Sequence, residues 1–333
     1  MEPLQDQEPL AIVSASPHIR TARTTRGIML DVCVALVPAL LAAVWWFGTR
    51  ALMVTVLSVG CCVGFEALLR LARKRPQTVG DLSAVVTGLL LAFNLPATLP
   101  LWMVPVGALV AIVVVKQLFG GIGQNFVNPA LTGRIVLLLS FATQMSGAWN
   151  LPNGHSWGAD AIATATPLQL AATRAPMPGL LEMFVGHRAG SLGETCALAL
   201  LLGGAYLITC KVISPLIPAC FIGTVAIGSL LYSGFDFTFM LQQLLSGGLL
   251  LGAIFMATDY ATSPVTRSGK VIFAVGCGLF TCLVRFWGNM PEGVSFAILL
   301  MNLLSPLIEN CTAPNVFGEE KAKKPKGAKK NEA

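Results

Sequence analysis

Long apolar stretches recur along this chain, and they limit what it can fold into. A helix needs about 20 apolar residues to cross the hydrocarbon core of a bilayer. Ten stretches approach or reach this length: 28–48, 51–72, 82–96, 100–118, 130–146, 194–212, 217–233, 239–257, 271–287 and 292–310. Only 11% of the 333 residues are charged, against roughly 25% in soluble proteins. The pattern predicts an all-α, multi-pass membrane protein.

The placement of lysine and arginine predicts the orientation. With a cytoplasmic N-terminus, 18 of the 22 basic residues fall on the cytoplasmic side, as the positive-inside rule requires. The other four are Arg50, Arg174, Arg188 and Arg285. All six tryptophans fall on the outer side, where such rings prefer the interface. The first 27 residues lack an apolar core, so we expect no cleavable signal peptide and place both termini in the cytoplasm.

The stretches GLLLAFNLPAT (88–98) and GLLLGAIFMAT (248–258) begin alike. Ten spans divide into five plus five, and an odd number per half makes the second copy inverted, as in many transporters. Coincidence between leucine-rich helices is the alternative interpretation. The predicted regions are a cytoplasmic segment (1–27), a first membrane repeat (28–146), an outer loop (147–193), a second membrane repeat (194–310) and a basic cytoplasmic tail (311–333).

Two polar loops on the predicted inner side, 120–134 and 257–270, are rich in Gly, Asn and Thr. Their side chains either line a polar pocket between the halves or cap helices and form turns. The residues concerned are Asn125, Asn128, Asp259, Thr262 and Ser263. GGIG (120–123) lacks the third glycine of a dinucleotide-binding fingerprint, so we do not predict a dinucleotide site there.

Few ionisable groups lie within the spans. Asp31 lies near the inner interface, Glu66 is placed to pair with Arg70 one turn on, and Glu292 lies at an outer end. These groups either snorkel or pair along a helix, or they form an ion relay. Nine cysteines form no CxxC pair and three histidines form no HExxH, so we expect no protein-ligated metal and treat the cysteines as small apolar residues. No residue pattern predicts a catalytic group or nucleic-acid binding.

The outer loop contains DAIATATPLQL (160–170), an unusual polar segment. Pro167 favours an extended Thr166 and removes one backbone donor. One interpretation is a helix start with Pro167 in the first turn. The other is an exposed, extended threonine that serves as substrate for another enzyme, because no neighbouring base activates its hydroxyl.

The chain resembles the NqrB/RnfD family of membrane subunits across nearly all of residues 14 to 311. The resemblance rests on six blocks: SPHIRT…TT (16–25), VNPALTGR (127–134), DAIATATPL (160–168), GSLGET (190–195), MATD…TSPVTRSGK (256–270) and PEGVSFAILLMNLLSPLIE (291–309). It is closest to RnfD of the Rnf electron-transport complex, and the related branch is NqrB of the sodium-pumping NADH:quinone reductase.

The resemblance implies FMN joined by a phosphoester to Thr166. The family motif matches at Asp160, Ala165, Pro167 and Leu168, and it departs at two positions, Ala163 and Thr164. Gly190, Gly193 and Glu194 match a block that lies near the flavin in the family; Glu194 is alternatively a first-turn acid of the sixth span. Arg174, His187 and Arg188 are either phosphate partners or ordinary loop residues.

The implied function is electron relay within an ion-translocating ferredoxin:NAD oxidoreductase of the bacterial cytoplasmic membrane, coupled to Na⁺ or H⁺. Implied partners are the membrane flavoprotein G, membrane subunits A and E, soluble subunits B and C, and a flavin transferase. Noncovalent riboflavin is a second implied cofactor, which the inner loops would suit. The alternatives are the NqrB component of the quinone reductase and a non-redox permease. The lysine-rich run 321–330 is either a solvated tail or a contact for anionic lipid or a soluble partner.

Overall fold

The structure, a computed structural model, describes residues 23–146, 149–150, 163–173, 175–288 and 292–313. The regular elements of these residues are helices, apart from a short antiparallel pairing of β1 (Trp149–Asn150) with β2 (Ala163–Thr164). The helices in chain order are α1 (Thr25–Phe47), α2 (Thr49–Ala72), η1 (Val79–Asp81), α3 (Ser83–Phe93), α4 (Met103–Leu109), η2 (Val110–Gln117), α5 (Pro129–Ser140), α6 (Ala142–Ser146), α7 (Pro167–Ala172), α8 (Leu180–Val185), α9 (Ala197–Thr209), α10 (Leu216–Ser233), α11 (Phe237–Leu245), α12 (Leu249–Leu251), η3 (Gly252–Met256), α13 (Arg267–Trp287) and α14 (Val294–Thr312).

Five of the described helices are long and apolar enough to cross a membrane: α1, α2, α10, α13 and α14. The pair formed by α11 and α12–η3 makes a sixth if it counts as one span, and it bends by 65° at its break. Four shorter apolar helices are α3, α4–η2, α5 and α9. Each predicted stretch coincides with one of these elements, which confirms a helical, multi-pass architecture. That all ten cross stays a prediction.

Side-chain caps fix where several helices begin. Thr24 Oγ1 accepts a hydrogen bond from the backbone N–H of Gly27, at 3.2 Å, at the start of α1. Asn128 Oδ1 accepts from the N–H of Ala130, at 3.1 Å, and Pro129 occupies the first turn of α5. Proline is suited to this position because its missing N–H would have no partner inside the helix. The block 127–134 is therefore a helix start.

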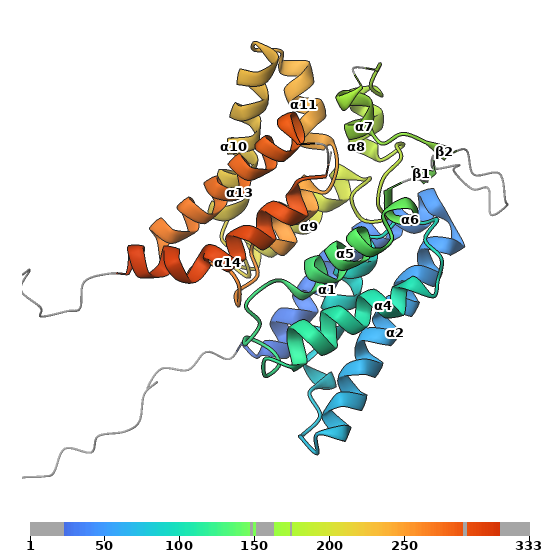
Figure 1. The fold of residues 1–333 in the computed structure, drawn as a ribbon, viewed down its shortest axis with the longest axis vertical. Helices are drawn as coiled ribbons and strands as arrows, with labels where there is room; N and C mark the ends of the chain where they lie inside the picture. Colours follow the sequence, from blue (N-terminus) through green and yellow to red (C-terminus); the bar gives the residue numbers. More distant parts are fainter. Residues whose placement is uncertain (1–22, 147–148, 151–162, 174, 289–291, 314–333) are drawn as a thin grey trace, which may run out of the picture.

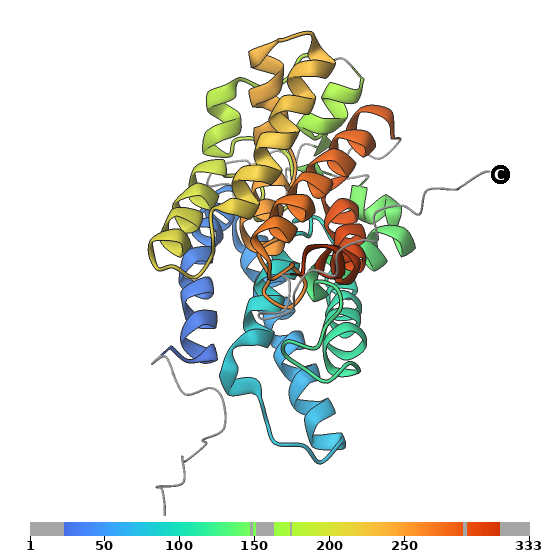
Figure 2. The ribbon, with the colours of Figure 1, turned by 90° about the vertical axis from the view of Figure 1, so that its left-hand side faces the viewer.

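Glycines allow helices to approach closely. A Cβ added to Gly203 of α9 would lie 2.2 Å from the carbonyl oxygen of Ala35 on α1. A Cβ on Gly88 of α3 would lie 2.7 Å from Cα of Val59 on α2. Small residues serve the same purpose in many membrane helix pairs. Figures 1 and 2 show the helices of residues 25–146 (blue to green) in one half and those of 197–312 (yellow to red) in the other, with α9 beside α1.

Two short helices end inside the molecule, where the halves meet. α3 ends at Phe93 and η3 ends at Met256, and both side chains are buried. The side-chain amide of Asn94 contacts Met256 Sδ at 3.6 Å, and the amide of Asn128 donates to the carbonyl oxygen of Met256 at 3.3 Å. The ends of α3 and η3 therefore lie beside the start of α5.

Candidate functional site

Thr166 lies between β2 and α7 and begins that helix. Its backbone is extended, with φ −68° and ψ 155°, as predicted. Its Oγ1 accepts a hydrogen bond from Gln169 N at 3.3 Å, and its N–H donates to Gln169 Oε1 at 2.9 Å. This reciprocal arrangement is a capping box. Pro167 follows at the first helical position, so the helix-start interpretation is the one that the structure shows.

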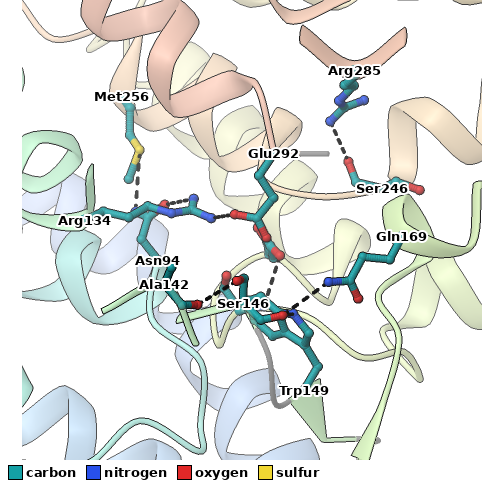
Figure 3. A network of polar contacts seen from close by, with 12 residues as sticks. Asn94, Arg134, Ala142, Ser146, Trp149, Gln169, Ser246, Met256, Arg285 and Glu292 are labelled. Atoms are coloured by element: carbon teal, nitrogen blue, oxygen red, sulfur yellow. Dashed lines mark hydrogen bonds and ion pairs between the residues drawn. The ribbon is translucent and has the colours of Figure 1, made fainter. Parts of the chain in front are cut away.

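The predicted exposure of Thr166 is wrong, because only 5% of its surface is accessible. Two contacts hold its segment against the molecule. Leu168 packs against Gly247: a Cβ added to this glycine would lie 2.5 Å from Leu168 Cδ1. Gln169 Nε2 donates to the carbonyl oxygen of Ser146 at 3.2 Å, next to the indole of Trp149, which donates to the same oxygen (Figure 3).

The second predicted block, around Gly190, Gly193 and Glu194, forms a buried turn. The N–H of Gly193 donates to the carbonyl oxygen of Phe93 at 3.0 Å, and a Cβ there would collide with the Phe93 ring. Only glycine therefore lets this turn reach the end of α3. Glu194 is not a first-turn acid of the sixth span, because α9 begins at Ala197. Its Oε1 instead accepts from the N–H of Ser191 at 3.0 Å.

The two predicted blocks meet at the break between α11 and α12. Leu168 lies against Gly247, and Glu194 Oε2 lies 3.1 Å from the position of a Cβ on Gly248. Ala165 is half-buried and Pro167 is buried. Asp160 lies outside the described residues, as does Arg174. The structure thus brings together every described residue of the two blocks.

Beneath these blocks lies a group of buried or nearly buried charges, which we term the charge cluster: Arg134, Arg188, Glu194, Arg285 and Glu292. Arg134 forms an ion pair with Glu292 and donates to Asn94 Oδ1 at 2.7 Å (Figure 3). Arg188 donates to the carbonyl oxygens of Glu194 and Thr195.

Arg285 of α13 donates to two carbonyl oxygens at the end of α11, that of Gln243 at 2.8 Å and that of Ser246 at 3.0 Å (Figure 3). Three guanidinium groups and two carboxylates leave the charge cluster with a net charge of +1 when all are ionised. Burial lowers the pKa of Arg188 to about 10, and the nearby Glu194 carboxylate opposes this shift. Arg188 is therefore still charged at neutral pH.

The sequence alone did not predict a site role for Arg134, Arg285 or Glu292. The available signal was their position within or beside apolar spans, where charged residues are costly and tend to be functional. His187 does not face the charge cluster: its ring stacks at a tilt on Trp46, 5.3 Å between centroids.

A cavity of about 370 Å³ is lined by residues of both halves, among them Leu90 of α3 and Phe255 of η3. It lies within the range of roughly 300–1,000 Å³ typical of small-molecule sites. Asn125, Asn128 and Asp259 line it, as predicted, together with apolar residues of α1 and α3. Thr262 and Ser263 are not among its lining residues. Pocket lining and helix capping, the two interpretations of these loops, are both correct for Asn128, which caps α5 and lines the cavity.

Two polar groups shape this cavity, the half-buried Asp259 and the buried Lys116. Burial raises the pKa of Asp259, while hydrogen bonds from Ala261, Thr262 and Asn125 oppose the shift. Lys116 also lines it, and its Nζ lies 2.7 Å from Glu66 Oε2 and 2.5 Å from Ser83 Oγ. The predicted Glu66–Arg70 pair is therefore wrong: the lysine reaches Glu66 from η2.

All nine cysteines lie in the described residues and are free. Three are buried, and only Cys311 is exposed. Among the residues that the structure describes, no three His, Cys, Asp or Glu side chains gather as a metal site.

Comparison with known proteins decides the family. A model of the NQR2, RnfD, RnfE family matches residues 12–318, which is most of the chain. The chain belongs to this family. Residues 127–134, 160–168 and 190–195, which the resemblance rested on, all fall within the matched range.

Relatives within the NQR2, RnfD, RnfE family align over almost their full length. The chain is 48% identical over 316 residues to the D subunit of the Na(+)-translocating ferredoxin:NAD(+) oxidoreductase complex of Acetobacterium woodii, covering 94% of this chain and 96% of the relative. It is 40% identical to the proton-translocating counterpart of Clostridium ljungdahlii, covering 96% and 99%. It is 36% identical to the D subunit of the ion-translocating oxidoreductase complex of Escherichia coli K12, covering 93% and 99%.

Proposed function

We propose that this protein is the RnfD component of an ion-translocating ferredoxin:NAD oxidoreductase complex and carries FMN on Thr166. The names of its full-length relatives support the complex. The observation that carries the flavin proposal is the position of the ATPL sequence (165–168): its last residue, Leu168, lies against Gly247 at the break, and the buried guanidinium of Arg285 lies against the same glycine. The translocated ion is Na⁺ or H⁺, since the relatives are named for both.

The residues around Thr166 fit a phosphoester. The threonine oxygen remains an acceptor for Gln169 N after esterification, so the start of α7 is preserved. Arg134 Nε and Arg285 Nε are buried donors without a partner among the described residues, and such groups favour an anionic neighbour. FMN supplies reversible electron transfer when bound, while the chain's own residues hold the phosphate end and keep water away.

The cavity between the halves is our proposed site for a noncovalent riboflavin. Its apolar wall from α1 and α3 suits a flat ring system, and Asn125, Asn128 and Asp259 offer hydrogen-bonding groups at its polar edge. These residues lie in non-helical loops that line the cavity. Non-helical backbone is tolerated within a membrane at such places.

We further propose that the two halves form an inverted repeat with both termini in the cytoplasm. The packing supports it: α2 packs on α4–η2, which packs on α5, and α10 packs on α13, which packs on α14. In this arrangement the segment of Thr166 faces the outside, where the flavin transferase and the membrane flavoprotein G would meet it, and the cavity faces the inside. Subunits A and E would be membrane neighbours and subunits B and C soluble ones, in the bacterial cytoplasmic membrane.

The proposal is tested by peptide mass spectrometry of residues 160–173 in protein from its native membrane. We expect an FMN mass on Thr166 and none on Thr164. Thr166→Ala should insert normally and lose the fluorescence of covalent flavin in a denaturing gel. An unmodified Thr166 in the assembled native complex would refute the flavin proposal, and a failure to copurify with partner subunits would refute the assignment to the complex.

A further inference from the structure

The charge cluster has a net charge of +1 when all five of its groups are ionised. Arg134 forms an ion pair with Glu292, and Arg188 lies beside Glu194. Arg285 donates only to backbone carbonyl oxygens, and no carboxylate of the described residues lies within ion-pair distance of it. It is only 9% exposed, and its Nε has no partner in the described part of the chain. A charged group without a directly paired counter-charge is costly to bury. An anion bound beside Arg285 would therefore stabilise the protein.

The segment that carries Thr166 comes close to this guanidinium at Leu168. A Cβ on Gly247 would lie 2.5 Å from Leu168 Cδ1 and 3.3 Å from Arg285 Nη2. Leu168 and Arg285 are therefore separated by little more than the width of one glycine. Thr166 lies two residues before Leu168, so the phosphate attached to its oxygen would lie on the segment that reaches this guanidinium.

We propose that Arg285 is the counter-charge and positioning residue for the phosphate that tethers the flavin to Thr166. The proposal rests on the proposed function, since it concerns the group attached at that oxygen. A phosphodiester between Thr166 and the ribityl chain carries one negative charge, which reduces the net charge of this buried region from +1 to zero. Arg285 thereby stabilises the flavin-bearing form over the unmodified form and restricts where the tether can point.

Alternative roles for Arg285 predict different behaviour. As a cap for the carbonyl groups at the end of α11, it would stabilise the modified and unmodified chains equally. As a counter-charge, it stabilises the modified chain more. A comparison of both chain forms for each variant separates these roles, because the capping contribution cancels in the difference.

The experiment measures thermal unfolding of the purified protein, produced with and without a flavin transferase, for wild type, Arg285→Gln, Arg285→Lys and Arg50→Gln. Arg50 is the matched control, since it also donates to two backbone carbonyls, those of Ala97 and Leu99, but lies away from the charge cluster. Intact-protein mass spectrometry gives the flavin-bearing fraction of each sample.

We expect flavin attachment to raise the melting temperature of wild type and Arg50→Gln by roughly 3 °C. Arg285→Gln should lose most of this gain, and Arg285→Lys should keep most of it, because the charge is retained. The proposal would be overturned if flavin attachment raised the melting temperature of Arg285→Gln as much as that of wild type. It would also be overturned if Arg285→Lys lost as much of this rise as Arg285→Gln. A wild-type chain without flavin on Thr166 would instead overturn the proposed function on which this inference rests.

Discussion

The pair formed by Lys116 and Glu66 is the clearest case of a residue whose partner is set by the fold. Both side chains are buried, and Ser83 and Thr78 complete the hydrogen bonds around them. Breaking such a pair costs far more than removing it entirely, because one buried charge is left uncompensated.

Lys116→Met should destabilise the protein by about 3–5 kcal/mol, because the Glu66 carboxylate loses its partner. The double variant Lys116→Met, Glu66→Gln should recover at least half of the loss, because no unpaired charge remains. Thermal unfolding in detergent measures both. Equal melting temperatures for the single and double variants would show that the pair is not coupled.

For individual residues, the sequence predicted the segment of the candidate site, but it did not predict which groups the buried charged side chains would contact. The order Asp160, Ala165, Thr166, Pro167, Leu168 identified the segment, because that motif is contiguous. The contacts of Arg134 with Glu292 and of Arg285 with α11 join residues far apart in the chain, and spacing along one helix holds no information about them. Glu66 shows the same limit: its sequence neighbour Arg70 was available, yet Lys116 lies closer in space.

At the scale of the element, α7 raises a question of access. Thr166 is buried and its oxygen already accepts a hydrogen bond inside the capping box, so an enzyme acting on it needs α7 to move away first. Helix α7 spans only six residues, and isolated helices of this length are unstable in water. Its position therefore depends on Leu168 and Gln169.

Gln169→Ala should increase the rate at which a flavin transferase modifies the purified, folded protein. Loss of a cap costs about 0.5–2 kcal/mol, which raises the population of the open segment by roughly 2- to 30-fold. The rate is followed by flavin fluorescence in a denaturing gel. Gln77→Ala is the control, since Gln77 also donates to a backbone carbonyl but lies on a different loop. An unchanged rate in Gln169→Ala would mean that the capping box does not limit access.

The long elements were predictable and their interruptions were not. Each of the ten stretches chosen by apolar length contains a helix in the structure, and five of these helices are long enough to cross a bilayer by themselves. The bend of 65° between α11 and α12 arises at Ser246–Gly248, where Gly247 has a φ of +62°, a conformation that glycine adopts readily. The start of the sixth span also shifted, because the turn of Gly193 against Phe93 occupies residues that an apolar count assigns to the helix.

At the scale of the whole molecule, the proposed architecture includes an orientation in the membrane. The charge count that placed both termini inside rests on 18 basic residues against four. Cys311 provides a natural probe, because it is exposed and lies at the end of α14, on the predicted inner side.

A membrane-impermeant maleimide should label Cys311 in inverted membrane vesicles and leave it unlabelled in intact cells. Leu181→Cys, on the exposed face of α8, should give the reverse pattern, since α8 belongs to the predicted outer loop. Cys311→Ala controls for labelling of the other cysteines. Labelling of Cys311 from outside would reverse the proposed orientation and place Thr166 in the cytoplasm.

The contacts at the ends of α3 and η3 fasten the two halves together. Asn94, Asn128 and Arg134 of the first half bind Met256 and Glu292 of the second, at the centre of the molecule. A protein fastened in this way has to break these bonds before its halves can rock against each other, as an alternating-access permease must do. Electron tunnelling has the opposite requirement, because its rate falls steeply with distance. For the electron relay that we propose, a rigid junction would hold the donor and the acceptor at one separation through every turnover.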